Sequence, residues 1–145
     1  MFNAIRLFVV IFFVSRHTMA KDNCKFRDSL DQCVSISFVE EISRRKDSKF
    51  ILKVLKPNGD NITLSLNDLN IELWMEMKSG HGHGSDKVLV KKNKNNFNIS
   101  NVWLLMIGEW QIKLTYTMQG KKVTATVPVC VGRKAKDSHM GHCSK

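Results

Sequence analysis

The sequence predicts an all-β protein, an immunoglobulin-like antiparallel β-sandwich of about seven strands. Apolar and polar residues alternate with a period of two along most of the chain, and residues typical of turns separate the alternating stretches. No stretch shows the longer apolar period of an extended amphipathic helix. Strands with one apolar and one polar face are what two antiparallel sheets packed face to face require.

The first three predicted strands lie in the first half of the chain. Residues 33–40 (CVSISFVE) and 49–55 (KFILKVL) each place three large apolar side chains on one face. Between them, residues 39–46 (VEEISRRK) are long enough only for a helical turn. Residues 57–59 (PNG) then give a strong turn signal. Because residues 61–66 (NITLSL) alternate again, they are predicted to form a hairpin with residues 49–55.

Four more strands are predicted in the second half. Residues 69–77 (LNIELWMEM) and 109–118 (EWQIKLTYTM) alternate over their whole length, and residues 86–91 (DKVLVK) form a shorter candidate. Residues 119–122 (QGKK) are predicted to turn the chain, and residues 123–131 (VTATVPVCV) return as the last strand.

Three residues of these strands have expected structural roles. Trp110 is predicted to anchor the core, and Gly108 to permit a bend or bulge just before it. Pro128 indicates an edge position for the last strand, because proline cannot donate a hydrogen bond to a neighbouring strand.

The N-terminus has the layout of a secretory signal peptide over residues 1–20. Arg6 supplies a positive charge, residues 7–14 are continuously apolar, and the small residue Ala20 precedes the expected cleavage site. The apolar run is too short for a membrane-spanning helix, which needs about 20 residues. Retention of the leader as an anchor is the alternative. The expected location is therefore periplasmic or secreted.

Cleavage would leave a polar flank over residues 21–32, the β-sandwich domain over residues 33–131 and a His- and Cys-containing polar tail over residues 132–145. No apolar run after the leader is long enough to cross a membrane, so no integral span is expected after cleavage.

The chain is basic, with a formal net charge of +10. The leader holds Arg6 and Arg16 and no acidic residue, so 21 basic residues remain against 13 acidic ones, a net charge of +8. The basic residues are scattered apart from one run, residues 91–96 (KKNKNN), which is predicted to be a solvated loop. This distribution argues against a nucleic-acid partner and favours a role in solubility or attraction to anionic membrane surfaces.

All four cysteines follow the leader, and an even number in an exported protein predicts disulfides. Cys33 and Cys130 border the sandwich, whereas Cys24 and Cys143 lie in the two flanks. A nested arrangement would pair Cys33 with Cys130 and Cys24 with Cys143. Pairing Cys24 with Cys33 and Cys130 with Cys143 is the alternative that the sequence leaves open.

Residues 79–85 (SGHGHGS) form a candidate metal site centred on His81 and His83. In an extended segment residues two apart point the same way, and glycines let the backbone bend around one ion. Imidazole suits Cu(II) and thioether sulfur suits Cu(I), so Met77 is a candidate third ligand, with Asp86 or a group from the tail as alternatives. The competing interpretation is a mobile loop with surface histidines.

Both methionines before this segment also have a structural interpretation. Met75 and Met77 continue the apolar face of the 69–77 strand, so each is a candidate core residue. Trp74 lies on the opposite face and is expected to be partly exposed or covered by a loop.

The tail is a second candidate for metal binding. His139, Met140, His142 and Cys143 are crowded into five positions, and short tracts of this composition bind metals. A disulfide at Cys143 would remove its thiolate as a ligand. Alternatively, the tail folds toward the first histidine segment and completes its ligand shell.

Sequence motifs of enzymes are absent. The chain contains no Gly-x-Ser-x-Gly elbow, no glycine-rich phosphate loop and no His-Glu-x-x-His pattern. An enzyme is therefore not expected.

Three motifs in order resemble the YtkA-like and FixH-like group of small exported bacterial domains. They are residues 75–84 (MEMKSGHGHG), residues 106–110 (MIGEW) and the hairpin of residues 111–131. The resemblance covers roughly residues 34–131, and its sharpest parts are His81-Gly82 and the Met-x-Gly-x-Trp step. It implies an immunoglobulin-like sandwich and a link with copper handling outside the cytoplasm.

The sequence thus predicts an exported metal-binding protein, with copper as the metal and His81, His83 and Met77 as ligands. The alternative is a metal-free immunoglobulin-like module that binds another protein of the bacterial envelope, suggested by Trp74 and the basic surface. The sequence does not indicate an oligomeric state.

Overall fold

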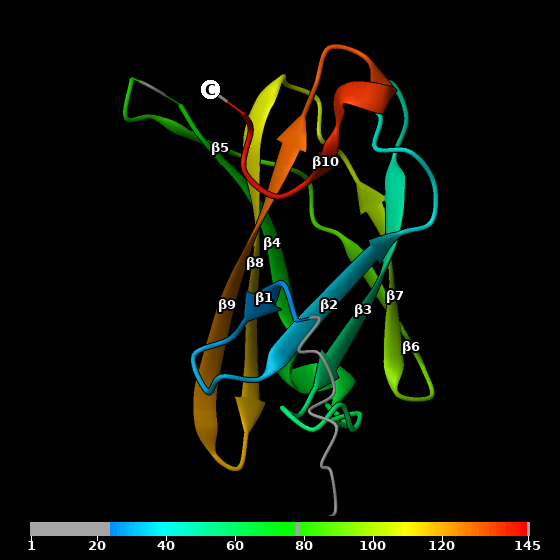
Figure 1. The fold of residues 1–145 in the computed structure, drawn as a ribbon, viewed down its shortest axis with the longest axis vertical. Coiled ribbons are helices and arrows are strands. Elements are labelled where there is room, and N and C mark those ends of the chain that lie inside the picture. The colour runs from blue at the N-terminus through cyan, green and yellow to red at the C-terminus, as the bar shows by residue number, and fades with distance from the viewer. Residues whose placement is uncertain (1–23, 78, 145) are drawn as a thin grey trace, which may run out of the picture.

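The computed structural model describes residues 24–77 and 79–144, which fold into two antiparallel five-stranded sheets packed face to face (Figure 1). The predicted all-β sandwich is confirmed. The predicted signal peptide, residues 1–20, lies outside the described residues. Within the described part, no helix has the length and apolar composition needed to cross a bilayer.

The two sheets have separate strand orders. Sheet A contains, in spatial order, β1 (Phe26–Arg27), β2 (Cys33–Phe38), β3 (Ser48–Leu55), β7 (Asn96–Val102) and β6 (Leu89–Asn93). Sheet B contains β10 (His139–Met140), β9 (Lys121–Val131), β8 (Gly108–Met118), β4 (Asn70–Glu76) and β5 (Gly82–Gly84). Two short 3₁₀ helices, Leu66–Asp68 and Ala135–Asp137, lie in the connections.

The alternating residues of both sheets face each other and form one core. Trp110 is 2% exposed and lies among buried aliphatic and aromatic side chains, so its predicted role as a core anchor is confirmed. Its indole Nε1 donates a hydrogen bond to the backbone oxygen of Met106 at 3.0 Å, which satisfies the one polar atom of the ring. The largest side chains that are fully buried are Trp110, Tyr116, Phe50 and Phe97.

The β8–β9 hairpin is the longest pairing of the fold. Its register runs without a bulge from Gly108 opposite Val131 to Met118 opposite Lys121. At the turn, Gln119 and Gly120 both have positive φ, 52° and 73°, the combination that fits the right-handed twist of a two-residue hairpin. The predicted turn is confirmed at residues 119–120, whereas Lys121 and Lys122, which were predicted to belong to it, begin β9.

Gly108 occupies the position expected of it, whereas the edge position predicted for the last strand from Pro128 is wrong, because β10 pairs with the outer side of β9. Gly108 has a φ of 132°, and a Cβ there would lie 2.5 Å from Cε of Met75, so the backbone at the start of β8 requires glycine. Pro128 lies on β9, where only the two-residue β10 covers the outer side, and its carbonyl accepts a hydrogen bond from the amide of Gly141 at 2.8 Å. The missing amide of the proline therefore leaves no strand bond unmade.

The predicted hairpin between residues 49–55 and 61–66 is wrong. Only an isolated bridge joins Leu55 to Asn61, and the amide of Ile62 bonds to the carbonyl of Val54 at 2.8 Å. Residues 61–66 cannot pair along β3, because β2 occupies one side of that strand and β7 occupies the other. The chain instead crosses to sheet B and buries Ile62 and Leu64 on the way.

The predicted loop over residues 91–96 is also wrong. Lys91 lies in β6, Asn96 begins β7, and Lys94 turns the chain between them with a φ of 53°. The strand β7 escaped prediction because its exposed positions are asparagine and serine, residues more typical of turns. Residues 39–46 form bends and no helical turn.

Ten strands are present in the described residues, against about seven predicted. The additional ones are short, as in β1, β5 and β10, or polar, as in β7. Two of them lie in the flanks, so each flank extends the edge of one sheet.

The disulfides join Cys24 to Cys33 and Cys130 to Cys143, which excludes the nested pairing. Each bond closes within one sheet, because β1 folds back on β2 and β10 folds back on β9. The two flanks also touch each other, since Nζ of Lys25 donates to the backbone oxygen of Met140 at 2.6 Å.

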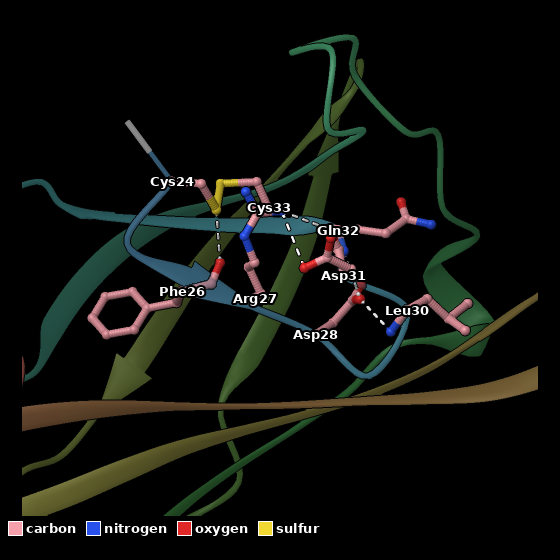
Figure 2. A network of polar contacts seen from close by, with 8 residues as sticks. All are labelled: Cys24, Phe26, Arg27, Asp28, Leu30, Asp31, Gln32 and Cys33. Atoms are coloured by element: carbon pink, nitrogen blue, oxygen red, sulfur yellow. Dashed lines mark hydrogen bonds and ion pairs between the residues drawn. A yellow bond between two sulfur atoms is a disulfide. The ribbon is translucent and has the colours of Figure 1, made fainter. Parts of the chain in front are cut away.

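A buried carboxylate connects the N-terminal flank to the core. Figure 2 shows Asp28 turning the chain, and its Oδ1 accepts hydrogen bonds from the amides of Leu30 and Gln32 at 2.8 and 2.9 Å. Its Oδ2 accepts the hydroxyl proton of Tyr116, which lies on β8 in the other sheet. Both residues are buried. Burial is the larger of two causes that raise the pKa of the Tyr116 hydroxyl well above its ordinary value, and the hydrogen bond with Asp28 is the second.

Replacement of Tyr116 by phenylalanine should lower the free energy of unfolding by about 1–3 kcal/mol, because it leaves one oxygen of the buried Asp28 without its donor. Urea denaturation measures this loss. Since folding raises the tyrosine pKa, the stability from the protonated hydroxyl should be complete below about pH 10 and decrease as the pH rises further.

The control is a double-mutant cycle with Asp28→Asn. Coupling between the two sites should exceed the ~0.3–0.5 kcal/mol that independent sites show. Additive effects within that range would mean that the contact does not stabilise the fold.

Candidate metal centre

The histidine segment lies on a hairpin formed by β4 and β5 that extends from one end of sheet B (Figure 1). In its register Met75 stands opposite His83 and Glu76 opposite Gly82. The amide of Met77 donates to the carbonyl of His81 at 2.8 Å, so the pairing continues for one more residue pair.

This register places the three predicted ligands on one face of the hairpin. Directly opposed residues of an antiparallel pair point to the same side, as do residues two apart on a strand. Met77 therefore shares a face with His81 across from it and with His83 two residues further on. The face is the one that buries Met75, continued beyond the end of the core.

Exposure divides the two methionines. Met75 is 8% exposed and packs in the core, as its structural interpretation predicts, whereas Met77 is 38% exposed and does not. The core interpretation of Met77 is therefore wrong, because the hairpin has passed the edge of the opposing sheet at this point. Both histidines are exposed, and Nδ1 of His81 lies 3.3 Å from the hydroxyl of Ser79.

The other face of the hairpin is held by Trp74. Its ring lies directly over Gly82, where an added Cβ would come within 1.9 Å of the indole. Nζ of Lys113 lies 5.0 Å from the ring centroid, a cation–π distance. The partial exposure of Trp74 thus follows from its position on the outer face, where Gly82 and the ammonium group of Lys113 cover part of the ring.

The remaining candidate ligands do not join this group. Among residues 24–77 and 79–144, no set of three or more His, Cys, Asp or Glu side chains is close enough to hold a metal ion. Asp86 is exposed beyond the end of β5. A site on the hairpin therefore consists of two imidazoles and a thioether.

The tail forms a separate arrangement over the start of β8. Nδ1 of His142 lies 2.9 Å from one carboxylate oxygen of Glu109, and the amide of Cys143 donates to the other at 3.2 Å. Nε2 of His139 lies 3.3 Å from the backbone oxygen of His142. Because Cys143 is in a disulfide, it offers no thiolate. Sequence reasoning missed the role of Glu109, since the two residues lie 33 positions apart.

A cavity of about 610 Å³ lies elsewhere, against β1, β2 and the turn after β3. Phe26, Ile36, Leu55 and Met140 contribute apolar walls, and the Cys24–Cys33 disulfide lines it as well. None of the three predicted ligands borders this cavity, so it is distinct from the hairpin face.

Comparison of the chain with models of known protein families, with curated proteins and with solved structures gave no match. The resemblance to the YtkA-like and FixH-like domains therefore stays a prediction, and the candidate site depends on its own geometry.

Replacement of Gly82 by alanine should displace Trp74 from the hairpin, because the new methyl group occupies the position of the indole. We expect a loss of about 1–3 kcal/mol of stability, as for other overpacked sites. The indole N–H signals in an NMR spectrum would report the displacement, with Trp74 shifted more than the other two tryptophans.

Gly84→Ala is the matched control, because its nearest neighbour beyond the adjacent residues lies 3.8 Å away. Equal perturbation of Trp74 by both substitutions would show that the close contact at Gly82 does not hold the hairpin.

Proposed function

We propose that this chain is an exported β-sandwich protein that binds copper on the β4–β5 hairpin through His81, His83 and Met77. The proposal is supported by the register of the β4–β5 hairpin. Its strand pairing continues to Met77, which lies across from His81, and both residues share a face with His83. Three donors suited to copper then project from a short, protruding segment.

The donor set suits both oxidation states of copper. Imidazole nitrogen is a good ligand for Cu(II), and thioether sulfur favours Cu(I). Hydrogen-bonded antiparallel pairs have Cα atoms about 5.5 Å apart, so flexible side chains such as methionine and histidine can converge on one ion between them. A set of three ligands leaves a coordination position open, which fits a protein that accepts and releases copper.

The cysteines support the proposed location. Both disulfides are formed, and such bonds persist in oxidising compartments such as the periplasm or the extracellular space. Together with the predicted signal peptide, they support an exported protein.

A second function is favoured by exposed apolar side chains near the hairpin. In the connection between β7 and β8, Leu105 is 57% and Ile107 47% exposed, and Gly108 at its end contacts Met75 at the base of the hairpin. Such residues are typical of contact surfaces, so a metal-free module that binds another envelope protein is the alternative.

Titration of the purified protein with Cu(II), and with Cu(I) under reducing conditions that spare the disulfides, tests the first proposal. The His81→Ala/His83→Ala variant should bind Cu(II) at least about tenfold more weakly. Loss of a residue that only hydrogen-bonds to a metal ligand already lowers metal affinity by about 10–100-fold, and this variant removes two ligands themselves. Met77→Leu should weaken binding of Cu(I) and leave Cu(II) nearly unchanged, because only the thioether prefers Cu(I).

The control is His139→Ala/His142→Ala, which removes two exposed histidines of the tail and should change neither affinity substantially. Equal copper binding by the wild type and the hairpin variant would refute the site. Loss of copper binding only in the tail variant would show that copper binds instead at the tail histidines near Glu109.

A further inference from the structure

The two sheets differ sharply in the charge of their strands. The strands of sheet A contain five basic residues and no aspartate or glutamate. Those of sheet B contain three acidic and three basic residues, which balance. The basic residues of sheet A are Arg27, Lys49, Lys53, Lys91 and Lys92. The net charge carried by the strands therefore lies on one layer of the sandwich.

Three of these lysines lie on the outer face of sheet A. Lys49 and Lys53 alternate with the buried positions of β3. Lys91 stands opposite Asn98, which itself stands opposite the outward-facing Ile51, so these residues form one row across three strands. The other two basic residues are engaged elsewhere, since Arg27 is in an ion pair with Asp31 and Lys92 donates to the backbone oxygen of Leu64 at 2.7 Å.

No acidic side chain neutralises the three outward lysines. Among the described residues, none of the three takes part in an ion pair. Glu40, beyond the end of β2, interacts electrostatically with Lys49, but it is in an ion pair with Lys46. The strands of this face therefore present positive charge to a flat partner.

Aliphatic side chains lie between these charges. Ile51 and Leu55 are partly exposed on the same face, and Leu89 on the edge strand β6 is 63% exposed. The outward positions of β2, β3, β7 and β6 carry no aromatic side chain and no arginine, and the one arginine of sheet A, Arg27 on β1, is in an ion pair with Asp31. Single-stranded nucleic acids are bound largely through stacking on aromatic side chains, whereas anionic lipid surfaces are bound by basic residues together with inserted apolar groups.

We infer that the outer face of sheet A binds the surface of a bilayer rich in anionic phospholipids, through Lys49, Lys53 and Lys91, with Leu89 inserted between the headgroups. In this orientation sheet B faces away from the membrane. The β4–β5 hairpin belongs to sheet B, so it lies in the layer away from the membrane. The inference rests on charge and does not depend on copper binding.

Flotation with vesicles tests the membrane surface directly. The probe is a vesicle of equal parts phosphatidylcholine and phosphatidylglycerol, compared with pure phosphatidylcholine, and the protein is the form purified after export. We expect binding only to the anionic vesicles, with affinity that falls as salt screens the charges. Failure to bind anionic vesicles at low salt would overturn the inference.

Two triple variants of equal charge locate the surface. Lys49→Gln/Lys53→Gln/Lys91→Gln should lose about fivefold in partitioning for each lysine, on the order of 100-fold in total. Lys121→Gln/Lys122→Gln/Lys136→Gln removes the same charge from exposed positions outside sheet A and should bind nearly as the wild type does. Equal losses in the two variants would mean that net charge alone attracts the protein, which contradicts a docking face.

The folded state of each variant is checked by circular dichroism. Leu89→Gln supplies an independent measurement, because it keeps every charge and should weaken binding only if the side chain enters the headgroup layer. Tight binding to heparin or duplex DNA by a protein that ignores anionic vesicles would assign the face to a different polyanion and refute the membrane inference.

Discussion

Met75 is buried against Gly108 and stands opposite Trp110 on one side and opposite His83 on the other. The register of β4 is therefore fixed by the core, where large side chains fill the space between the sheets. A shift of one residue would move every apolar side chain of β4 to the solvent face. Since β5 takes its register from β4, the same packing decides which way both histidines point.

The arrangement of the hairpin shows how a site can be built where a core ends. The core-facing side of sheet B continues past the end of the sandwich, so positions that would otherwise be buried become exposed. On the outer face Trp74 lies on Gly82 and ties β5 to β4. The hairpin thus carries a thioether and two imidazoles into solvent, while Met75 at its base stays packed in the core.

The flanks close the side of the sandwich on which β1 and β10 lie. Each flank adds a short edge strand and a disulfide to one sheet, and Lys25 bonds across to the backbone of Met140. Asp28 connects the same region to Tyr116 in the opposite sheet. The amide of Ser29 also donates to the carbonyl of Thr124 at 2.9 Å. Short, covered edges of this kind protect a sandwich from pairing with other chains.

The sequence by itself determined the fold class, most strands, the tight turn of the β8–β9 hairpin and the core residues of the strands that it predicted correctly, because alternation and turn chemistry are local properties. It also identified His81, His83 and Met77 as candidates. The tertiary structure decided that Met77 leaves the core, that residues 61–66 cross between sheets, and that the cysteines pair within each sheet. These outcomes depend on which strand occupies each edge and where the opposing sheet ends. Both are set by contacts between residues far apart in the chain, which no local pattern encodes.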